Sequence, residues 1–358
     1  MDLVSVIVPC YNAASYIDNL SVFFNQTYPE IEFIVVDDCS TDNSWEKLQD
    51  LKHTYTDRRI TIYRNEVNLG AGLTRNKGFA LSSGQFVCFW DIDDRVEPNF
   101  VEKMLGKLQE ERADFVCCDY FSSQDAQTSN KTLHQLKELM EKPSTEQLKS
   151  NVFDNWCAPF PWNKLIRRDF IEKFNIEFPS IFAGEDQCWV ISLVLNANKV
   201  AYLDMPLYDH IFYQTSLSSQ TSDRSSQALF DMLDFKYKYM QQYKTISGLD
   251  EKWLFHFFEM YFFFWNKLNS NIELQKSFAL KSRDFCQEHG VCLSEDNLKL
   301  GSAFPLYRLI PKLEFCKELR SELKRRYRLF SYIRKYKAIL RIVDLVMQEK
   351  QQKENKKC

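Results

Sequence analysis

Three aspartates stand close together after an apolar run of the sequence. Residues 86–90 read FVCFW, and Asp91, Asp93 and Asp94 follow them. On a strand or its exit turn, residues i and i+2 point the same way, so Asp91 and Asp93 can face one ion. Hard divalent cations such as Mg²⁺ and Mn²⁺ take oxygen ligands, and two carboxylates leave positions open for a diphosphate. The pattern indicates a metal site, and the alternative is a capped turn exposed to water.

A second acidic pair, Asp37 and Asp38, ends the apolar run FIVV of residues 33–36. Residues 40–44 offer Ser, Asp and Asn side chains that cap a following helix. Capping explains these later residues but not the pair itself. A carboxylate at the end of a strand can accept a hydrogen bond from a base N–H or a ribose hydroxyl. The pair therefore predicts contact with a nucleoside.

A glycine-rich turn leads into a helical pattern at residues 70–78, which read GAGLTRNKG. This segment is not GxGxxG, and the chain has no GxxxxGK[ST] segment, so neither a Rossmann dinucleotide site nor a P-loop is supported. Arg75 in this segment either neutralises a phosphate or is solvated.

Glu185 and Asp186 begin the strongly apolar segment AGEDQCWVISLVL of residues 183–195. Acidic side chains suit a helix N-terminus, and a carboxylate placed there can also act as a general base. The helix N-terminus lowers the pKa of Asp186 and the neighbouring Glu185 raises it, so the sequence leaves the balance open. Trp162, in PWNKL of residues 161–165, is either a platform for a sugar face or a core anchor, and the core is favoured.

Strands and helices alternate along the first third of the chain. Strands are expected at residues 4–12, 33–42, 60–65, 85–93 and 114–120, and helices at 13–25, 45–51, 70–83 and 100–110. The strands are apolar throughout, so both faces of their sheet are covered. The pattern predicts an α/β fold with a mostly parallel central sheet flanked by helices. Ligands of such sheets bind beyond the carboxyl ends of the strands, where Pro9–Asn12, Asp37–Asp38 and Asp91–Asp94 fall.

Charge is unevenly distributed along the chain. The net charge of the 358 residues is −3, yet residues 1–120 hold 11 Lys and Arg against 20 Asp and Glu. An acidic front half favours a bound cation, and a nucleic-acid partner is not expected. Residues 320–341 hold nine Lys and Arg and one Glu, with helical apolar spacing. This basic segment either lies on an anionic membrane surface or packs on the catalytic domain or a second subunit.

The eleven cysteines predict a reduced, cytoplasmic protein. No CxxC pair exists, and six cysteines lie in or beside apolar runs, namely Cys10, Cys39, Cys88, Cys117, Cys118 and Cys188. Met1 leads directly into a strand pattern, so no signal peptide is expected. No apolar run reaches the roughly 18–20 residues of a membrane span. The longest, residues 253–265, is expected to be a buried aromatic helix, with a membrane-lying helix as the alternative.

Four motifs, in order, resemble the family 2 glycosyltransferases, which have the GT-A fold. VSVIVPCYN (4–12) matches the family's opening strand, and VVDDCSTD (35–42) resembles its VDDGSTD, with Cys39 where Gly is usual. NLGAGLTRNKGFALSSGQFVCFWDIDD (68–94) resembles the stretch that ends in the family's DxDD, and GEDQCW (184–189) resembles its acceptor-side motif. The resemblance implies a catalytic domain at 1–220, with a nucleotide-sugar half at 1–120 and an acceptor half at 151–220. A helical C-terminal region is expected at 225–350.

The resemblance also implies roles for individual residues. Asp93 and Asp91 would hold Mn²⁺ or Mg²⁺, Asp94 would shape the turn, and Asp186, with Glu185, would be catalytic. The candidate substrate-binding residues are Pro9, Tyr11, Asn12, Asp37, Asp38, Arg75, Asp91, Trp162, His210 and Ser216. The family carries a basic residue and a Ser in a late loop, for which LYDHIFYQTSLS offers His210 with Ser216 or Ser218.

The expected function is that of an inverting glycosyltransferase with a nucleoside-diphosphate sugar donor, by family usage a UDP-sugar. The acceptor would be a glycan or a lipid-linked saccharide of a surface polysaccharide, and the enzyme would be cytoplasmic or peripheral on the membrane. Two alternatives are a sugar-phosphate nucleotidyltransferase and an inactive glycan- or nucleotide-binding scaffold. PCYNAASYI (9–17) lacks the basic, glycine-rich loop expected of the nucleotidyltransferase. Both acidic motifs are present, which argues against the scaffold.

Overall fold

The computed structural model describes most of the chain up to residue 289. It describes residues 1–123, 131–134, 145–150, 152–154, 158–213, 222–246 and 272–289, and single residues at 249, 253, 256, 257, 260, 264, 267 and 268. The chain divides into two compact units. The first unit holds residues 1–220 and 231–258, and the second holds residues 221–230 and 259–358.

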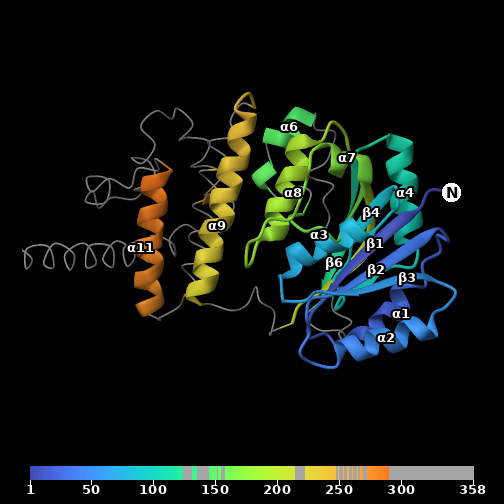
Figure 1. Ribbon diagram of the computed structural model, residues 1–358. Helices are drawn as coiled ribbons and strands as arrows, with labels where there is room; N and C mark the ends of the chain where they lie inside the picture. The colour runs from blue at the N-terminus through green and yellow to red at the C-terminus, as the bar shows by residue number, and fades with distance from the viewer. Residues whose placement is uncertain are drawn as a thin grey trace, which may run out of the picture. The chain divides into compact units, whose positions relative to one another are not determined.

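A central sheet forms the core of the first unit, and its first half is parallel (Figure 1). β1 (Val4–Cys10) pairs with β2 (Ile31–Asp37) and β4 (Phe86–Phe89), and β2 pairs with β3 (Arg59–Arg64), all in parallel. These strands are the apolar runs that the sequence predicted. β4 ends earlier than expected, so Asp91–Asp94 lie in a turn after the strand and not on it.

The second half of the sheet is mixed. β8 (Lys164–Arg167) lies antiparallel between β4 and β6 (Phe115–Ser123), and β9 (Val200–Ile211) runs parallel to β6. β5 (Arg95–Val96) and β7 (Lys131–His134) complete the nine-stranded sheet as antiparallel partners of β9 and β6. The α/β class is confirmed, but the mostly parallel arrangement holds only for the first half.

Helices cover both faces of this sheet. α1 (Leu20–Phe23), α2 (Ser44–Thr54), α3 (Ala71–Leu81), α4 (Phe100–Glu111) and α8 (Glu185–Asn196) are the main ones, and α6 (Thr145–Ser150) and α7 (Arg168–Lys173) are shorter. Single helical turns lie at Ile17–Asn19 and Val152–Asp154. The four helices predicted in the first 110 residues are therefore present, although residues 13–25 form only short turns.

Two consecutive aromatic residues show why both faces must be covered. The ring of Phe89 packs edge-on against Trp189 of α8 at 5.2 Å. The next residue, Trp90, points to the opposite face, where its ring lies 5.2 Å from Phe23 of α1 and 5.4 Å from Phe100 of α4. Because alternate residues of a strand face opposite sides, a strand apolar at every position needs helices on both.

The second unit is described for two helical segments. α9 (Asp223–Met240) begins in this unit, and α11 (Ile272–Glu288) lies wholly in it. Phe230 packs against Phe278 and Phe285 at ring distances of 5.2 and 5.5 Å. Asp223 pairs with Lys281 at 3.0 Å. These helices agree with the helical pattern expected after residue 225.

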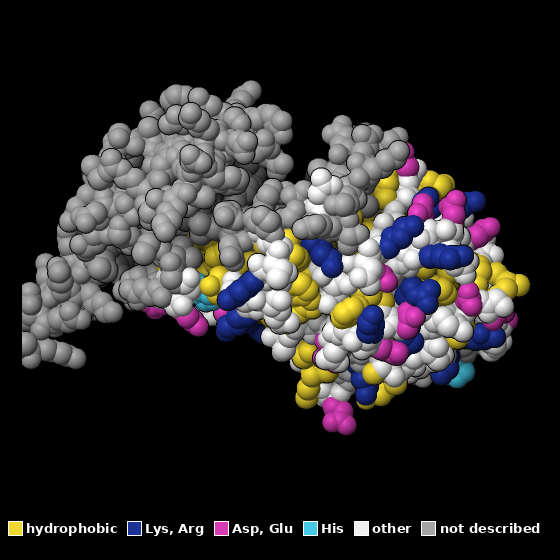
Figure 2. All heavy atoms as spheres, turned by 90° about the horizontal axis from the view of Figure 1, so that it is seen from above, with side chains coloured by type: hydrophobic (Ala, Val, Ile, Leu, Met, Phe, Trp, Pro, Cys, Tyr) yellow, Lys and Arg dark blue, Asp and Glu magenta, His cyan; other side chains and the backbone are white. Residues whose placement is uncertain are grey.

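Several expectations fall outside the described residues. They concern the basic segment 320–341, its membrane or subunit contact, and most of the aromatic run 253–265, of which Trp253, Phe257 and Phe264 are described and buried. None of the helices in the described part of the chain is long and apolar enough to cross a membrane. On the face shown in Figure 2, the described Lys and Arg side chains are interspersed with Asp and Glu side chains.

Candidate active site

The turn after β4 is fixed by the end of β9. Asp94 is fully buried and accepts hydrogen bonds from the Tyr208 hydroxyl and the Ile211 amide, both at 2.8 Å. The Tyr208 oxygen in turn accepts the Asp91 backbone N–H at 3.1 Å. His210 Nδ1 lies 3.2 Å from Asp94. Asp94 is therefore committed to the shape of the turn, which leaves Asp91 and Asp93 as the acidic side chains of this turn that can meet a ligand.

Asp93 is partly buried close to two other carboxylates, and its pKa is raised as a result. Burial, followed by the charges of Asp94 and Asp91, raises the pKa of Asp93 to about 7. A bound divalent cation would favour the ionised form of such a group. The two carboxylates offer the oxygen ligands that Mg²⁺ and Mn²⁺ prefer, so Asp91 and Asp93 fit a cation of this kind.

Arg75 on α3 joins the turn to the start of α8. Its Nη2 donates to Asp91 Oδ1 at 2.8 Å, and its Nη1 donates to Glu185 Oε1 at 3.2 Å. Burial acts to lower the pKa of Arg75, but the charges of Asp91 and Glu185 outweigh burial and raise it. The guanidinium also lies over the ring of Phe178 at 5.4 Å. Arg75 is therefore a buried, paired cation, and the solvated alternative for this residue is wrong.

The close approach of α3 and α8 depends on a glycine. A Cβ atom added to Gly72 would lie 2.8 Å from Glu185 Cγ. Real Cβ atoms do not come that close, so a larger residue would push the two helices apart. Gly72 therefore allows α3 and α8 to lie close enough for Arg75 on α3 to pair with Glu185 on α8.

Asp186 lies beside Glu185 in the first turn of α8. Its Oδ1 accepts the backbone N–H of Gln187 at 2.7 Å. Burial raises the pKa of Asp186, the charge of Glu185 raises it further, and the charge of Arg75 lowers it. The sequence alone left open whether the pKa of Asp186 is raised or lowered, and in the structure it is raised. A carboxyl group with this property is suited to accept a proton near neutral pH.

Asp37 and Asp38 lie at the tip of β2, but both are buried. Asp38 accepts hydrogen bonds at 2.8 Å from Asn65 Nδ2 and from the backbone N–H groups of Leu69 and Gly70. Asp37 Oδ2 pairs with Arg64 Nε at 3.2 Å. The loop before α3 and the end of β3 therefore supply donors to these carboxylates, while Asp37 Oδ1 is buried without a hydrogen-bond partner among the described residues. Their contact with a base or ribose stays a prediction.

The tip of β1 keeps one exposed aromatic side chain. Tyr11 is 49% exposed, whereas Pro9 is half-buried. Asn12 has a positive φ of 48°, and its Oδ1 accepts the Thr41 backbone N–H at 2.8 Å, which ties this tip to the loop after β2. Tyr11 was predicted to contact the nucleotide base, and its exposed ring is available for such a contact.

Trp162 is in the core and not a sugar platform. It is 2% exposed and stacks on Tyr208 at 4.6 Å and on His210 at 5.4 Å. The sequence already favoured the core, and the substrate-binding assignment of Trp162 is corrected. Burial acts to lower the pKa of His210, but the hydrogen bond to Asp94 and the carboxylate charges raise it. Ser216 and Ser218 lie outside the described residues.

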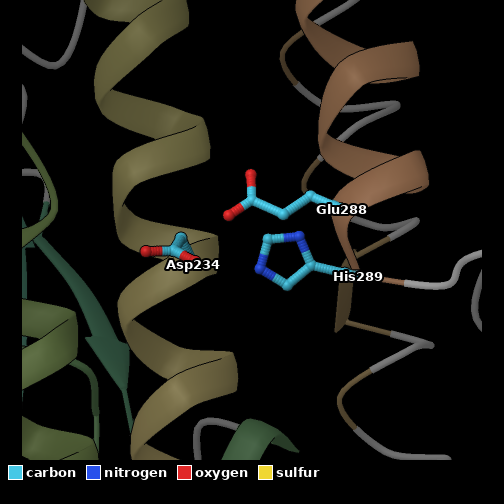
Figure 3. A group of neighbouring side chains, drawn as sticks. All are labelled: Asp234, Glu288 and His289. Atoms are coloured by element: carbon cyan, nitrogen blue, oxygen red, sulfur yellow. The ribbon is translucent and has the colours of Figure 1, made fainter.

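A second group of possible metal ligands lies outside this site. Figure 3 shows Asp234 on α9, and Glu288 and His289 at the end of α11. Asp234 belongs to the first unit, whereas Glu288 and His289 belong to the second. Asp234 also pairs with Lys238 one turn along its own helix, at 2.8 Å. We therefore assign no metal site to these residues.

Comparison with known proteins identifies a family. The model of the family described as Glycosyl transferase family 2 matches residues 5–174. TuaG of Bacillus subtilis, a glycosyltransferase assigned to teichuronic acid biosynthesis, is 37% identical over 219 residues, which cover 61% of this chain and 82% of TuaG. EpsH of B. subtilis, also named a glycosyltransferase, is 33% identical over 222 residues, covering 60% of this chain and 62% of EpsH. The match thus spans less than two thirds of EpsH.

Solved structures share the fold at low sequence identity. The crystal structure of S. aureus TarS 1–349 in complex with UDP-GlcNAc has a TM-score of 0.66 and 21% identity, covering 98% of this chain and 92% of TarS 1–349. The mannosyltransferase PcManGT from Pyrobaculum calidifontis, in complex with GDP-Man and Mn²⁺, has a TM-score of 0.52 and 15% identity, covering 97% and 86%. The predicted GT-A fold is confirmed.

The buried carboxylate of Asp38 gives a test of stability. Replacement by Ala leaves two backbone N–H groups and one amide without their acceptor, so Asp38→Ala should lower the free energy of unfolding by about 2–4 kcal/mol. Urea unfolding followed by circular dichroism measures the change. Asp50→Ala on the exposed side of α2 is the control and should change the free energy little. Equal stability of the two variants would contradict the role of Asp38.

Proposed function

The chain belongs to glycosyl transferase family 2, and we propose that it transfers a sugar from a nucleoside-diphosphate sugar to an acceptor hydroxyl. The observation that carries this proposal is the bridge of Arg75 between Asp91 and Glu185. The bridge brings the end of β4, which would hold the donor's phosphates, next to the first turn of α8, where Asp186 lies. Metal ligands and a base within one site suit a displacement at a sugar carbon.

A UDP-sugar is the proposed donor. The TarS structure is a complex with UDP-GlcNAc and the PcManGT structure is a complex with GDP-Man, so the shared fold accommodates donors of this class. In this chain, Tyr11 at the tip of β1 would contact the base, and His210 beside Asp94 would approach the diphosphate. The name of TuaG refers to a cell-wall polymer, which supports a surface polysaccharide or its lipid-linked precursor as the acceptor.

Asp93 and Asp91 would hold a divalent cation, Mn²⁺ or Mg²⁺. When bound, such a cation supplies Lewis-acid stabilisation of the negative charge that develops on the departing diphosphate. The chain's own part is to supply the oxygens, and Asp94 and Tyr208 hold the turn that presents them. Arg75 keeps Asp91 in place from the other side.

Asp186 is the proposed general base. The acceptor oxygen forms a bond to the anomeric carbon while the bond from that carbon to the diphosphate oxygen breaks. The electron pair of the broken bond leaves with the diphosphate, and the acceptor proton passes to Asp186. A single displacement of this kind inverts the configuration of the sugar carbon. Glu185, held by Arg75, would fix the first turn of α8 and keep Asp186 in position.

The family match favours glycosyl transfer over the two alternatives. EpsH and TuaG are both named as glycosyltransferases, which does not favour the nucleotidyltransferase. An inactive scaffold would not need the paired Arg75 or the carboxyl of Asp186 with its raised pKa. The predicted cytoplasmic location stays a prediction, and so do the alternative contacts of the basic segment 320–341 with a membrane or a second subunit.

Replacement of Asp93 tests the metal site. Asp93→Ala removes one of the two proposed ligands, so the enhancement of UDP binding by Mn²⁺ should be lost while weak, metal-independent binding remains. Isothermal titration calorimetry with UDP, with and without Mn²⁺, measures this difference. Asp57→Ala, at a carboxylate that is 77% exposed, is the control and should bind like the wild type. Unchanged metal dependence in Asp93→Ala would count against the assignment.

Replacement of Asp186 tests the base. Asp186→Asn keeps the shape but cannot accept the proton, so turnover should fall by about 10²- to 10⁴-fold while the affinity for UDP stays the same. Release of UDP, coupled to acceptor glycosylation, measures turnover. Asp169→Asn is a matched control, because Asp169 also lies in the first turn of a helix but is 68% exposed and pairs with Arg167. Full turnover by Asp186→Asn would refute the assignment.

The pH dependence of activity follows from the same carboxyl. Burial first, and then Glu185, raises the pKa of Asp186 to about 7. The ionised form is the base, so kcat/KM should rise with pH, with its midpoint at about pH 7, and level off at about pH 8. Initial rates between about pH 5.5 and about pH 8.5 give the profile. The residual activity of Asp186→Asn should lack this acidic limb. A limb of the same position in that variant would assign it to another group.

A further inference from the structure

We infer that Lys236 on α9 is a positioning residue for Asp186, holding the first turn of α8 and offsetting the negative charge gathered there. The inference rests on the proposed function, because it takes Asp186 as the base. Lys236 lies outside every motif that the sequence analysis singled out. It touches neither the donor-side turn nor the tip of β1 in the described contacts, and it is 1% exposed.

α9 packs directly against the start of α8. Gly184 caps α8 with a positive φ of 89°, and a Cβ at this position would lie 2.7 Å from Met232 Sδ. Cys188 Sγ lies 3.8 Å from the backbone oxygen of Met232. Residues four apart share one helix face, so Lys236 lies on the same face of α9 as Met232. The lysine is thereby directed at the turn that carries Asp186.

The ammonium group of Lys236 has two partners in the first unit. Nζ donates to Gln187 Oε1 at 2.9 Å and lies 2.9 Å from His256 Nε2. Gln187 follows Asp186 directly, and its backbone N–H donates to Asp186 Oδ1 at 2.7 Å. Gln187 therefore links the buried cation to the proposed base: its side chain accepts a hydrogen bond from Lys236, and its backbone N–H donates one to Asp186.

His256 acts as an acceptor in this arrangement. Burial, followed by the charge of Lys236, lowers the pKa of His256 well below its usual value, so the imidazole is neutral. Burial also lowers the pKa of Lys236, to about 8, although the negative charge of Asp186 opposes this. Lys236 is therefore still mainly cationic at neutral pH, and the positive charge of the pair belongs to the lysine.

The charges around Asp186 explain why a second cation is needed. Glu185 on the same helix and Asp91 after β4 both raise the pKa of Asp186, while Arg75 lowers it. Arg75 already pairs with both of these other carboxylates. Lys236 approaches from α9 and interacts with the charge of Asp186 itself. A buried, unpaired lysine would be costly, so its retention beside acidic groups indicates mutual compensation.

The rest of α9 does not depend on Lys236. Asn196, at the far end of α8, donates to the Tyr239 hydroxyl at 2.7 Å and accepts from the Tyr243 hydroxyl at 2.7 Å. These contacts, together with that of Met232 on Gly184, hold residues 232–240 of α9 against both ends of α8. A neutral residue of similar length at position 236 should therefore leave the helix pair in place.

The test is the pH profile of Lys236→Met. Loss of the positive charge should raise the pKa of Asp186, so the acidic limb of kcat/KM should move up by about half a unit or more. At neutral pH, where a base of pKa about 7 is half ionised, a shift of about half a unit to one unit corresponds to a loss of about 2- to 6-fold. UDP affinity with Mn²⁺ should not change. Lys238→Met is the matched control, because Lys238 is on the same helix, is 65% exposed and pairs with Asp234.

Further measurements make each outcome decisive. Melting temperature and UDP affinity establish that Lys236→Met is folded, and if it is not, Lys236→Gln is assayed in the same way. A folded neutral variant whose acidic limb stays at the wild-type position overturns the inference. Strongly reduced turnover in Asp186→Asn, combined with an unmoved limb in Lys236→Met, refutes the role of Lys236 alone. Full turnover in Asp186→Asn refutes the proposed base.

Discussion

The site depends on one buried guanidinium. Arg75 is paired with Asp91 on one side and Glu185 on the other, and the three come from α3, the turn after β4 and the start of α8. Without Arg75 the carboxylates would repel one another, and without the carboxylates a buried Arg would be unpaired. The interaction therefore joins two parts of the chain that lie 110 residues apart in the sequence.

The fold supplies the frame for this interaction, and the sequence predicted its first half well. β1, β2 and β4 are largely apolar runs, because helices cover both of their faces, whereas β3 at the edge of the sheet is only partly buried. The later strands were missed for physical reasons. β8 has only four residues, and β9 contains Asp204, Pro206 and Asp209, which break an apolar pattern. Their pairing comes from tertiary contacts, including the register shifts between β6 and β9 at Cys118–Tyr120.

The sequence predicted which polar clusters meet but not what each carboxylate does. The ends of parallel strands meet at one edge of the sheet, so the gathering of Asp38 and Asp91 near that edge follows from the pattern. Whether a carboxylate is free depends on backbone donors that the fold brings to it. Backbone N–H groups of a loop donate hydrogen bonds to Asp38, and a backbone N–H of β9 donates one to Asp94. Tyr208, which anchors Asp94, lies in the segment LYDHIFYQTSLS but was given no role there, and its spacing of two from His210 is its only signal.

Lys236 extends the same logic to a helix beyond the motifs. It occupies the apolar face of α9, at helical spacing from Leu229, Met232, Leu233 and Met240, all of which are buried. A lysine at such a position is the one signal that the sequence offered for it. Burial forces this cation to find compensating groups, and those it finds lie in the first turn of α8. The acidic turn is thus held between two buried cations from different elements, and its chemistry depends on packing as much as on its own residues.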